Sequence, residues 1–284
     1  MSARVEEIRL NLGHIELAAH VFGPVDGLPV IALHGWLDNA NSFARLAPRL
    51  LGLRIVALDL AGHGYSQHRP VGAGYHLADY VHDVLRVAEQ MGWARFGLLG
   101  HSLGAVISVQ LAGALPERIS HLALIDGVIP PTAGEQEAAE RLGLALQAQL
   151  RSDGKRKSVY PTLEQGVQAR MKGMVAVSCE AAELLAERGL MPVPGGYSWR
   201  SDSRLTLPSP VRLSEAQAMA FAKRIQCPSC LVVAEQGLLA RHTTLLEQLP
   251  FEQVVLPGGH HLHLNDEHGA SLVADCFNRF FGFA

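Results

Sequence analysis

Several features that mark other classes of protein are scarce in this chain of 284 residues. Charged residues make up only 18% of it, and 24 Lys and Arg against 27 Asp and Glu give a formal net charge of −3. This balance argues against nucleic acid or an anionic membrane surface as the main partner. No apolar run is long enough to span a bilayer. The 48% of hydrophobic residues is nevertheless sufficient for one large core.

Cysteine is also scarce, with only Cys179, Cys227, Cys230 and Cys276. Cys227 and Cys230 have a CxxC spacing, but no second pair accompanies them, so we expect buried thiols and no zinc ribbon. Residues 1–7 are charged and do not lead into the apolar stretch of a secretory leader. These features predict a reduced, cytoplasmic protein that needs neither metal nor cofactor.

Short apolar runs alternate with helical patterns along most of the chain. The runs predict strands at 15–22, 29–33, 54–58, 96–99, 121–125, 229–234 and 253–256. The helical patterns lie at 43–51, 77–91, 103–115, 239–249 and 270–281. This alternation predicts an α/β fold in which a mostly parallel central sheet is covered by helices on both faces.

Residues 130–210 break the alternation. Helical patterns occur at 135–150, 163–174 and 180–188, and 191–199 is an irregular stretch rich in Pro and Gly. No strong strand pattern lies between them. We therefore expect an inserted, mainly helical lid, carried by a core made of residues 1–129 and 211–284.

A Gly-His-Ser-Leu-Gly motif at 100–104 joins a predicted strand to a predicted helix. A serine at such a turn exposes its hydroxyl at a strained corner, and the flanking glycines relieve the crowding. The free N–H groups at the start of the helix favour a negatively charged oxygen nearby. The motif therefore predicts a nucleophilic Ser102.

Four landmarks in order resemble the α/β-hydrolase superfamily. They are the segments 34–36, 59–66, 100–104 and 259–260, each following a predicted strand. Segments 34–43, 197–204 and 259–264 are similar to the serine hydrolase-like branch in particular. The resemblance implies an oxyanion hole formed by the backbone N–H groups of Leu103 and Trp36.

The resemblance also implies a catalytic base in the histidine-rich segment after the last strand. His260 matches the family position, with His261 and His263 as alternatives. A zinc site built from these three histidines is not expected, because no partner ligands are evident elsewhere. His101 adjoins the nucleophile and is expected to line the substrate pocket.

The acid of the triad departs from the family pattern. Most members carry it after the strand that follows the lid, but Gly237 stands where we expect the aspartate. Asp126, at the end of the preceding strand, resembles the acid of certain lidded haloalkane dehalogenases and is the preferred candidate. Glu235 is the alternative. The order Ser102, Asp126, His260 is the serine–acid–histidine order of this fold.

These residues predict a serine hydrolase that cleaves an ester or similar acyl bond of a small to medium, largely apolar substrate. The lid is expected to enclose that substrate beneath Trp36, Tyr197 and Trp199. A carbon–carbon bond hydrolase or a perhydrolase would use the same triad. A non-catalytic, ligand-sensing protein of the same fold is a further alternative, because fold alone does not determine function.

Overall fold

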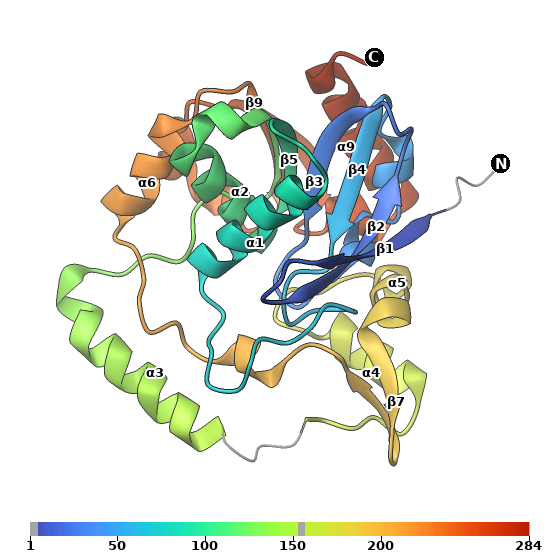
Figure 1. Ribbon diagram of the computed structural model, residues 1–284, viewed down its shortest axis with the longest axis vertical. Coiled ribbons are helices and arrows are strands. Elements are labelled where there is room, and N and C mark those ends of the chain that lie inside the picture. Colours follow the sequence, from blue (N-terminus) through green and yellow to red (C-terminus); the bar gives the residue numbers. More distant parts are fainter. Residues whose placement is uncertain (1–4, 153–156, 284) are drawn as a thin grey trace.

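The computed structural model describes residues 5–152 and 157–283. In this part of the chain eight strands form one sheet, in the order β1-β2-β4-β3-β5-β6-β9-β10 (Figure 1). The strands are β1 (Glu6–Asn11), β2 (Glu16–Phe22), β3 (Leu28–Leu33), β4 (Leu53–Leu58), β5 (Phe96–His101), β6 (Ile119–Ile125), β9 (Ser229–Gln236) and β10 (Glu252–Gly259). From β4 to β10 all neighbours are parallel, whereas β2 pairs antiparallel with both β1 and β4. The predicted fold class is confirmed.

The central strands are apolar on both sides, because helices cover both faces of the sheet. On β3, Ile31 and Leu33 pack into a core with the helices α1 and α2, while Val30 and Ala32 face the opposite core with α9. The helices that cover the two faces are α1 (Leu77–Gln90), α2 (Leu103–Ala114), α6 (Glu215–Arg224) and α9 (Glu267–Phe281). Side chains alternate along each strand, so both halves of the apolar pattern are buried.

Two of the predicted helices are shorter than expected. The pattern at 43–51 forms two 3₁₀ turns, η1 (Ala40–Phe43) and η2 (Ala47–Arg49). Pro48 lies in the first turn of η2, where its missing N–H is harmless, but it cannot continue a helix from η1. The pattern at 239–249 likewise divides into η6 (Leu239–Arg241) and α7 (Thr243–Glu247).

The segment between β6 and α6 contains helices and one strand pair. Its helical elements are η4 (Glu135–Glu137), α3 (Ala138–Ser152), α4 (Leu163–Met171), α5 (Cys179–Gly189) and η5 (Ser203–Thr206). Helices α4 and α5 share an apolar cluster of their own, whereas α3 extends away from the sheet and buries only Ala145 (Figure 1).

The expectation of an irregular stretch at 191–199 is wrong. These residues form a hairpin of β7 (Leu190–Val193) and β8 (Gly196–Trp199). Val193 pairs with Gly196, so Pro194 and Gly195 are the two turn residues, and Gly195 has a φ of 91°. Proline followed by glycine at the centre of a turn is the signature of a type II turn.

The cysteines differ in burial. Cys230 and Cys276 are buried with their sulfurs 3.9 Å apart, whereas Cys227 is half-buried and Cys179 is exposed. The expectation of buried thiols at the CxxC pair therefore holds for Cys230, whereas Cys227 is only half-buried. All four are free thiols.

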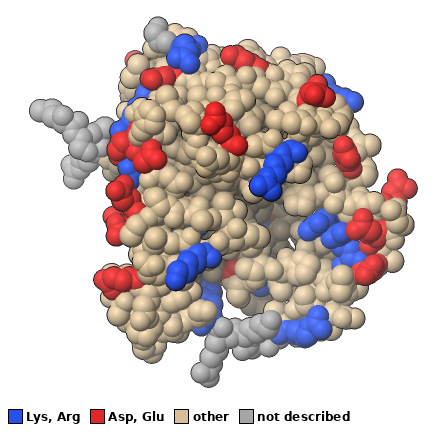
Figure 2. Space-filling model, turned by 180° about the vertical axis from the view of Figure 1, so that it is seen from behind, with Lys and Arg blue, Asp and Glu red and all other residues tan. Residues whose placement is uncertain are grey.

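The surface shown in Figure 2 carries basic and acidic side chains interspersed with one another. None of the helices within residues 5–152 and 157–283 has the length and apolar character needed to cross a membrane.

Candidate active site

Three predicted site residues follow strands that lie close together in the sheet. Ser102 comes directly after β5, Asp126 after β6 and His260 after β10. The strands β5, β6, β9 and β10 are neighbours in the sheet and run parallel, so their carboxyl ends lie side by side along one edge of it. Ligands of open α/β sheets bind at this edge.

The backbone at Ser102 has the strained turn that the motif predicts. Its φ of 51° and ψ of −113° lie outside the regions that L residues prefer. A side chain on Gly104 would overlap the carbonyl of Leu33, and one on Gly100 would lie 2.5 Å from the Cα of Ala105. The Ser102 N–H donates to the carbonyl of Ile125 at 3.1 Å. The glycines thus let α2 begin directly against the end of β3.

The His260 Nδ1 lies 2.6 Å from the Asp126 Oδ2, and both side chains are buried. The Oδ2 also accepts the N–H of Leu238 at 2.7 Å, and Oδ1 accepts the N–H of Leu239 at 3.3 Å. This carboxylate is therefore held from two sides. The alternative acid, Glu235, is exposed on β9.

The structure explains why position 237 carries glycine and not the aspartate found in most of the family. A Cβ at this position would overlap the carboxylate of Asp126, with Oδ1 only 2.5 Å away. The Asp126 carboxylate thus occupies the space at the position where most of the family carries its acid. A side chain at 237 and the observed His260–Asp126 hydrogen bond exclude one another.

We expect Gly237→Ala to reduce kcat at least about tenfold, because the Asp126 carboxylate must move away from His260 and small misplacements of catalytic groups cost up to about 100-fold. Gly143→Ala is the matched control, since nothing lies within 4 Å of a Cβ at that position on α3. The measurement is steady-state hydrolysis of a short p-nitrophenyl ester. A Gly237→Ala enzyme as active as Gly143→Ala would contradict this account of the glycine.

The loop after β3 carries Trp36 and is fixed by two buried histidines. His34 Nε2 accepts the N–H of Leu60 at 3.0 Å, and His63 Nε2 accepts the N–H of Leu37 at 3.3 Å. Burial lowers the pKa of His34 to about 4 and that of His63 to about 3, so both are neutral and can accept. Leu37 has a φ of 62°, which these contacts help to maintain.

The indole of Trp36 reaches the segment that was expected to form the lid. Its Nε1 donates to the carbonyl of Leu205, in η5, at 3.0 Å. Leu103 is the first residue of α2, so its N–H is one of the four that have no partner inside a helix. The role of these two backbone N–H groups in an oxyanion hole stays a prediction.

His101 does not line an open pocket, contrary to expectation. Its side chain is fully buried among the rings of His260, His261 and His263, with centroids 4.4–4.8 Å away. Its Nε2 lies 3.0 Å from the carbonyl oxygen of His260, to which it donates. Burial, reinforced by the neighbouring histidines, holds the pKa of His101 well below its usual value. This neutral ring positions the backbone of His260.

The His101 ring also explains the glycine before Trp36, because a Cβ on Gly35 would lie 2.9 Å from the His101 Nδ1.

Sequence reasoning missed a buried ion pair beside this cluster. Asp38, from the Trp36 loop, lies 2.7 Å from the guanidinium of Arg170 and 3.1 Å from the Nε2 of His261. Burial alone would raise the pKa of Asp38, but His261 and Arg170 hold it well below its usual value. His261, considered above as an alternative base, is thus engaged in joining the loop to α4. No motif marks Arg170, because its partner is distant in the sequence.

Tyr197 and Trp199 pack against the apolar cluster of α4 and α5. A Cβ on Gly189 would overlap the ring of Trp199, so the indole lies directly over the end of α5. The structure therefore shows both aromatic side chains in the packing of the inserted segment.

The sheet order, the strained turn at Ser102 and the contact between His260 and Asp126 are typical of an α/β-hydrolase. A family model described as "alpha/beta hydrolase fold" matches residues 29–160. The chain is 31% identical to "Serine hydrolase-like protein" of Danio rerio, covering 98% of this chain and 89% of that protein. It therefore belongs to the α/β-hydrolase superfamily and, within it, to the serine hydrolase-like branch.

Two solved structures are similar over nearly the whole chain. The hypothetical protein PA1622 from Pseudomonas aeruginosa PAO1 is 65% identical, with a TM-score of 0.96 over 98% of this chain and 100% of that one. A thioesterase domain from the curacin biosynthetic pathway is 26% identical, with a TM-score of 0.84 over 97% of this chain and 99% of that one. The fold extends over the chain well beyond the segment that the family model matches.

Proposed function

We propose that this protein is a serine hydrolase that cleaves an ester or similar acyl bond through an acyl-enzyme. The observation that carries the proposal is the buried 2.6 Å contact between His260 and Asp126, at the edge of the sheet where Ser102 occupies its strained turn. A serine needs a neighbouring base, and the base needs an acid that orients it.

In the proposed reaction, the Asp126 carboxylate accepts a hydrogen bond from the Nδ1–H of His260, which keeps the proton on Nδ1 and leaves Nε2 free to accept a proton. Ser102 Oγ attacks the acyl carbon as its proton passes to His260. The N–H groups of Trp36 and Leu103 stabilise the oxyanion of the tetrahedral intermediate. His260 then gives its proton to the leaving group, and water releases the acyl group by the same steps.

The substrate we propose is small to medium and largely apolar, enclosed by a lid formed by residues 130–210. The hydrogen bond from Trp36 to Leu205 supports this proposal, because it joins the oxyanion loop to the end of that segment. The similarity to a thioesterase domain supports acyl chemistry, in which the bond to a carbonyl carbon is cleaved.

The proposal is tested by labelling the folded protein with a fluorophosphonate and measuring turnover of short p-nitrophenyl esters. We expect one label per chain on Ser102, because only a serine activated by a base reacts rapidly with this reagent. Ser102→Ala should remain unlabelled and inactive. An unlabelled wild-type protein whose ester turnover equals that of Ser102→Ala would exclude the enzyme proposal.

A further inference from the structure

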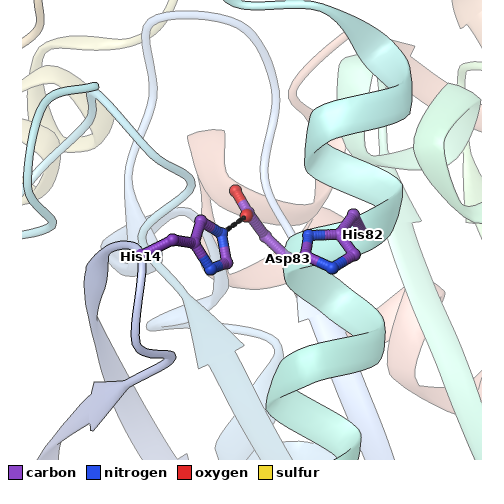
Figure 3. A group of neighbouring side chains, drawn as sticks. All are labelled: His14, His82 and Asp83. Carbon is purple, nitrogen blue, oxygen red and sulfur yellow. Dashed lines mark hydrogen bonds and ion pairs between the residues drawn. The ribbon is translucent and has the colours of Figure 1, made fainter. Parts of the chain in front are cut away.

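A group of potential metal ligands, two of them exposed and one buried, lies on other elements than the active site. It consists of His14, His82 and Asp83, and Figure 3 shows the Asp83 carboxylate beside the His14 ring. Each residue offers one ligand atom, and these atoms all lie within 4.8 Å of one another. His14 belongs to the connection between β1 and β2, whereas His82 and Asp83 are neighbours on α1. The β1–β2 edge is opposite to β10, which precedes His260.

Rigid elements hold the three residues. On either side of the exposed tip with His14, Leu12 and Ile15 are buried in the core that also contains α1, and the Leu12 N–H donates to the Ile15 carbonyl at 2.9 Å. Gly13 has a φ of 90°, and its N–H donates to the Asn11 side chain. The His14 position is therefore set by the same packing that joins the hairpin to α1.

The distance between two of the ligand atoms suits one metal ion. His14 Nε2 lies 2.8 Å from Asp83 Oδ1. Two ligands of a tetrahedral metal ion, with bonds of about 2.1 Å, are about 3.4 Å apart, so these two atoms need to separate by only about 0.6 Å to share an ion. The other carboxylate oxygen, Oδ2, accepts from the Arg69 guanidinium at 2.6 Å. Arg69 thus orients Asp83 and leaves Oδ1 directed at His14, as outer hydrogen bonds do in metal sites.

The contacts with Arg69 and His14 explain why Asp83 can be buried, but they do not involve His82. The His82 ring is exposed, with its centroid 5.1 Å from that of His14. Two imidazoles and one carboxylate oxygen form the type of set that binds Zn²⁺ and similar ions, with water completing the coordination.

We propose that His14, His82 and Asp83 form a binding site for a divalent transition-metal ion. His14 binds through Nε2 after its proton moves to Nδ1, which replaces the hydrogen bond to Asp83 by a shared ion. The exposed His82 ring adjusts its rotamer to complete the site. Since the ligands come from two elements, the bound ion joins the β1–β2 hairpin to α1 and stabilises the folded protein.

The test is Zn²⁺ binding to the untagged full chain, measured by competition with a chromophoric chelator, together with Tm with and without Zn²⁺. We expect His82→Ala and His14→Ala each to weaken binding at this site at least about tenfold and to remove the rise in Tm. His76→Ala, which removes an exposed histidine just before α1, should behave as wild type.

His82→Ala is the decisive variant, because the exposed ring has no part in the Asp83 contacts and its loss should not disturb folding. If the wild-type chain binds a second ion at other residues, each variant should bind one ion fewer. Unchanged stoichiometry and affinity in both variants would overturn the proposal, as would a wild-type chain without Zn²⁺ binding.

Discussion

Replacing Asp126 with asparagine is expected to lower kcat for a short p-nitrophenyl ester by about 10³-fold or more. The Oδ2 atom faces two N–H donors, from His260 and Leu238. An amide nitrogen there would oppose both donors. With the amide oxygen there instead, the negative charge that stabilises the protonated histidine is lost.

Glu235→Gln is the control because it makes the same chemical change at the alternative acid. Glu235 is exposed, and we expect a change in kcat of about twofold or less, as for most surface substitutions. The rate of fluorophosphonate labelling should fall in Asp126→Asn as well, because it depends on the same activated serine. Equal losses in the two variants, or a larger loss in Glu235→Gln, would reassign the acid.

The residues of the proposed triad are marked in the sequence to different degrees. Ser102 is marked by a short motif, since the demands on a strained turn are local, and His260 is marked by its match to the family position after the last strand. The absence of aspartate at Gly237 is visible in the sequence, but its reason is not. Only the fold shows that the carboxylate of Asp126 fills the space at 237.

The positioning groups around His260 could not be predicted, because their partners are distant along the chain. His261 has the residue type of a base, and only the structure shows it beside Asp38 and Arg170. His101 adjoins Ser102 in sequence, yet its ring is directed into the interior and contacts the carbonyl of His260.

Within the fold, doubly buried strands were predicted best because their apolar runs are continuous. β1 was missed, since it is an edge strand in which Ile8 and Leu10 alternate with charged or polar residues. The β7–β8 hairpin was missed although Pro194 and Gly195 carry a turn signal. Its strands are only four residues long, and one of them contains a proline.

The free energy of unfolding is expected to fall steeply as the pH drops from about 7 to about 5. Burial lowers the pKa of His34 to about 4, and the pKa values of His63 and His263 to about 3. In the unfolded chain a histidine has a pKa of about 6.5. Above that value each is neutral in both states and contributes nothing to the pH dependence.

Below about pH 6.5 the unfolded chain binds protons that the folded chain excludes, so each of these histidines lowers stability by up to about 1.4 kcal/mol per pH unit. The loss of stability continues until the pH reaches the pKa of these histidines in the folded protein, which is about 3 to 4. The hydrogen bonds give the structural reason. His34 Nε2 accepts the N–H of Leu60, and a proton on that nitrogen would place two donors face to face.

His263→Gln isolates one of these contributions. The glutamine amide can reproduce the 3.1 Å contact of His263 Nε2 with Ser42 Oγ but does not titrate. The free energy of unfolding is measured with urea at about pH 6 and about pH 5. Its decrease between these two pH values should be smaller in His263→Gln than in wild type, by about 1 kcal/mol. His268→Gln removes an exposed histidine and should retain the wild-type difference. Because the comparison uses a difference between two pH values, a uniform loss of stability in His263→Gln does not affect it. An unchanged difference in His263→Gln would mean that His263 gains its proton equally in the folded and unfolded states.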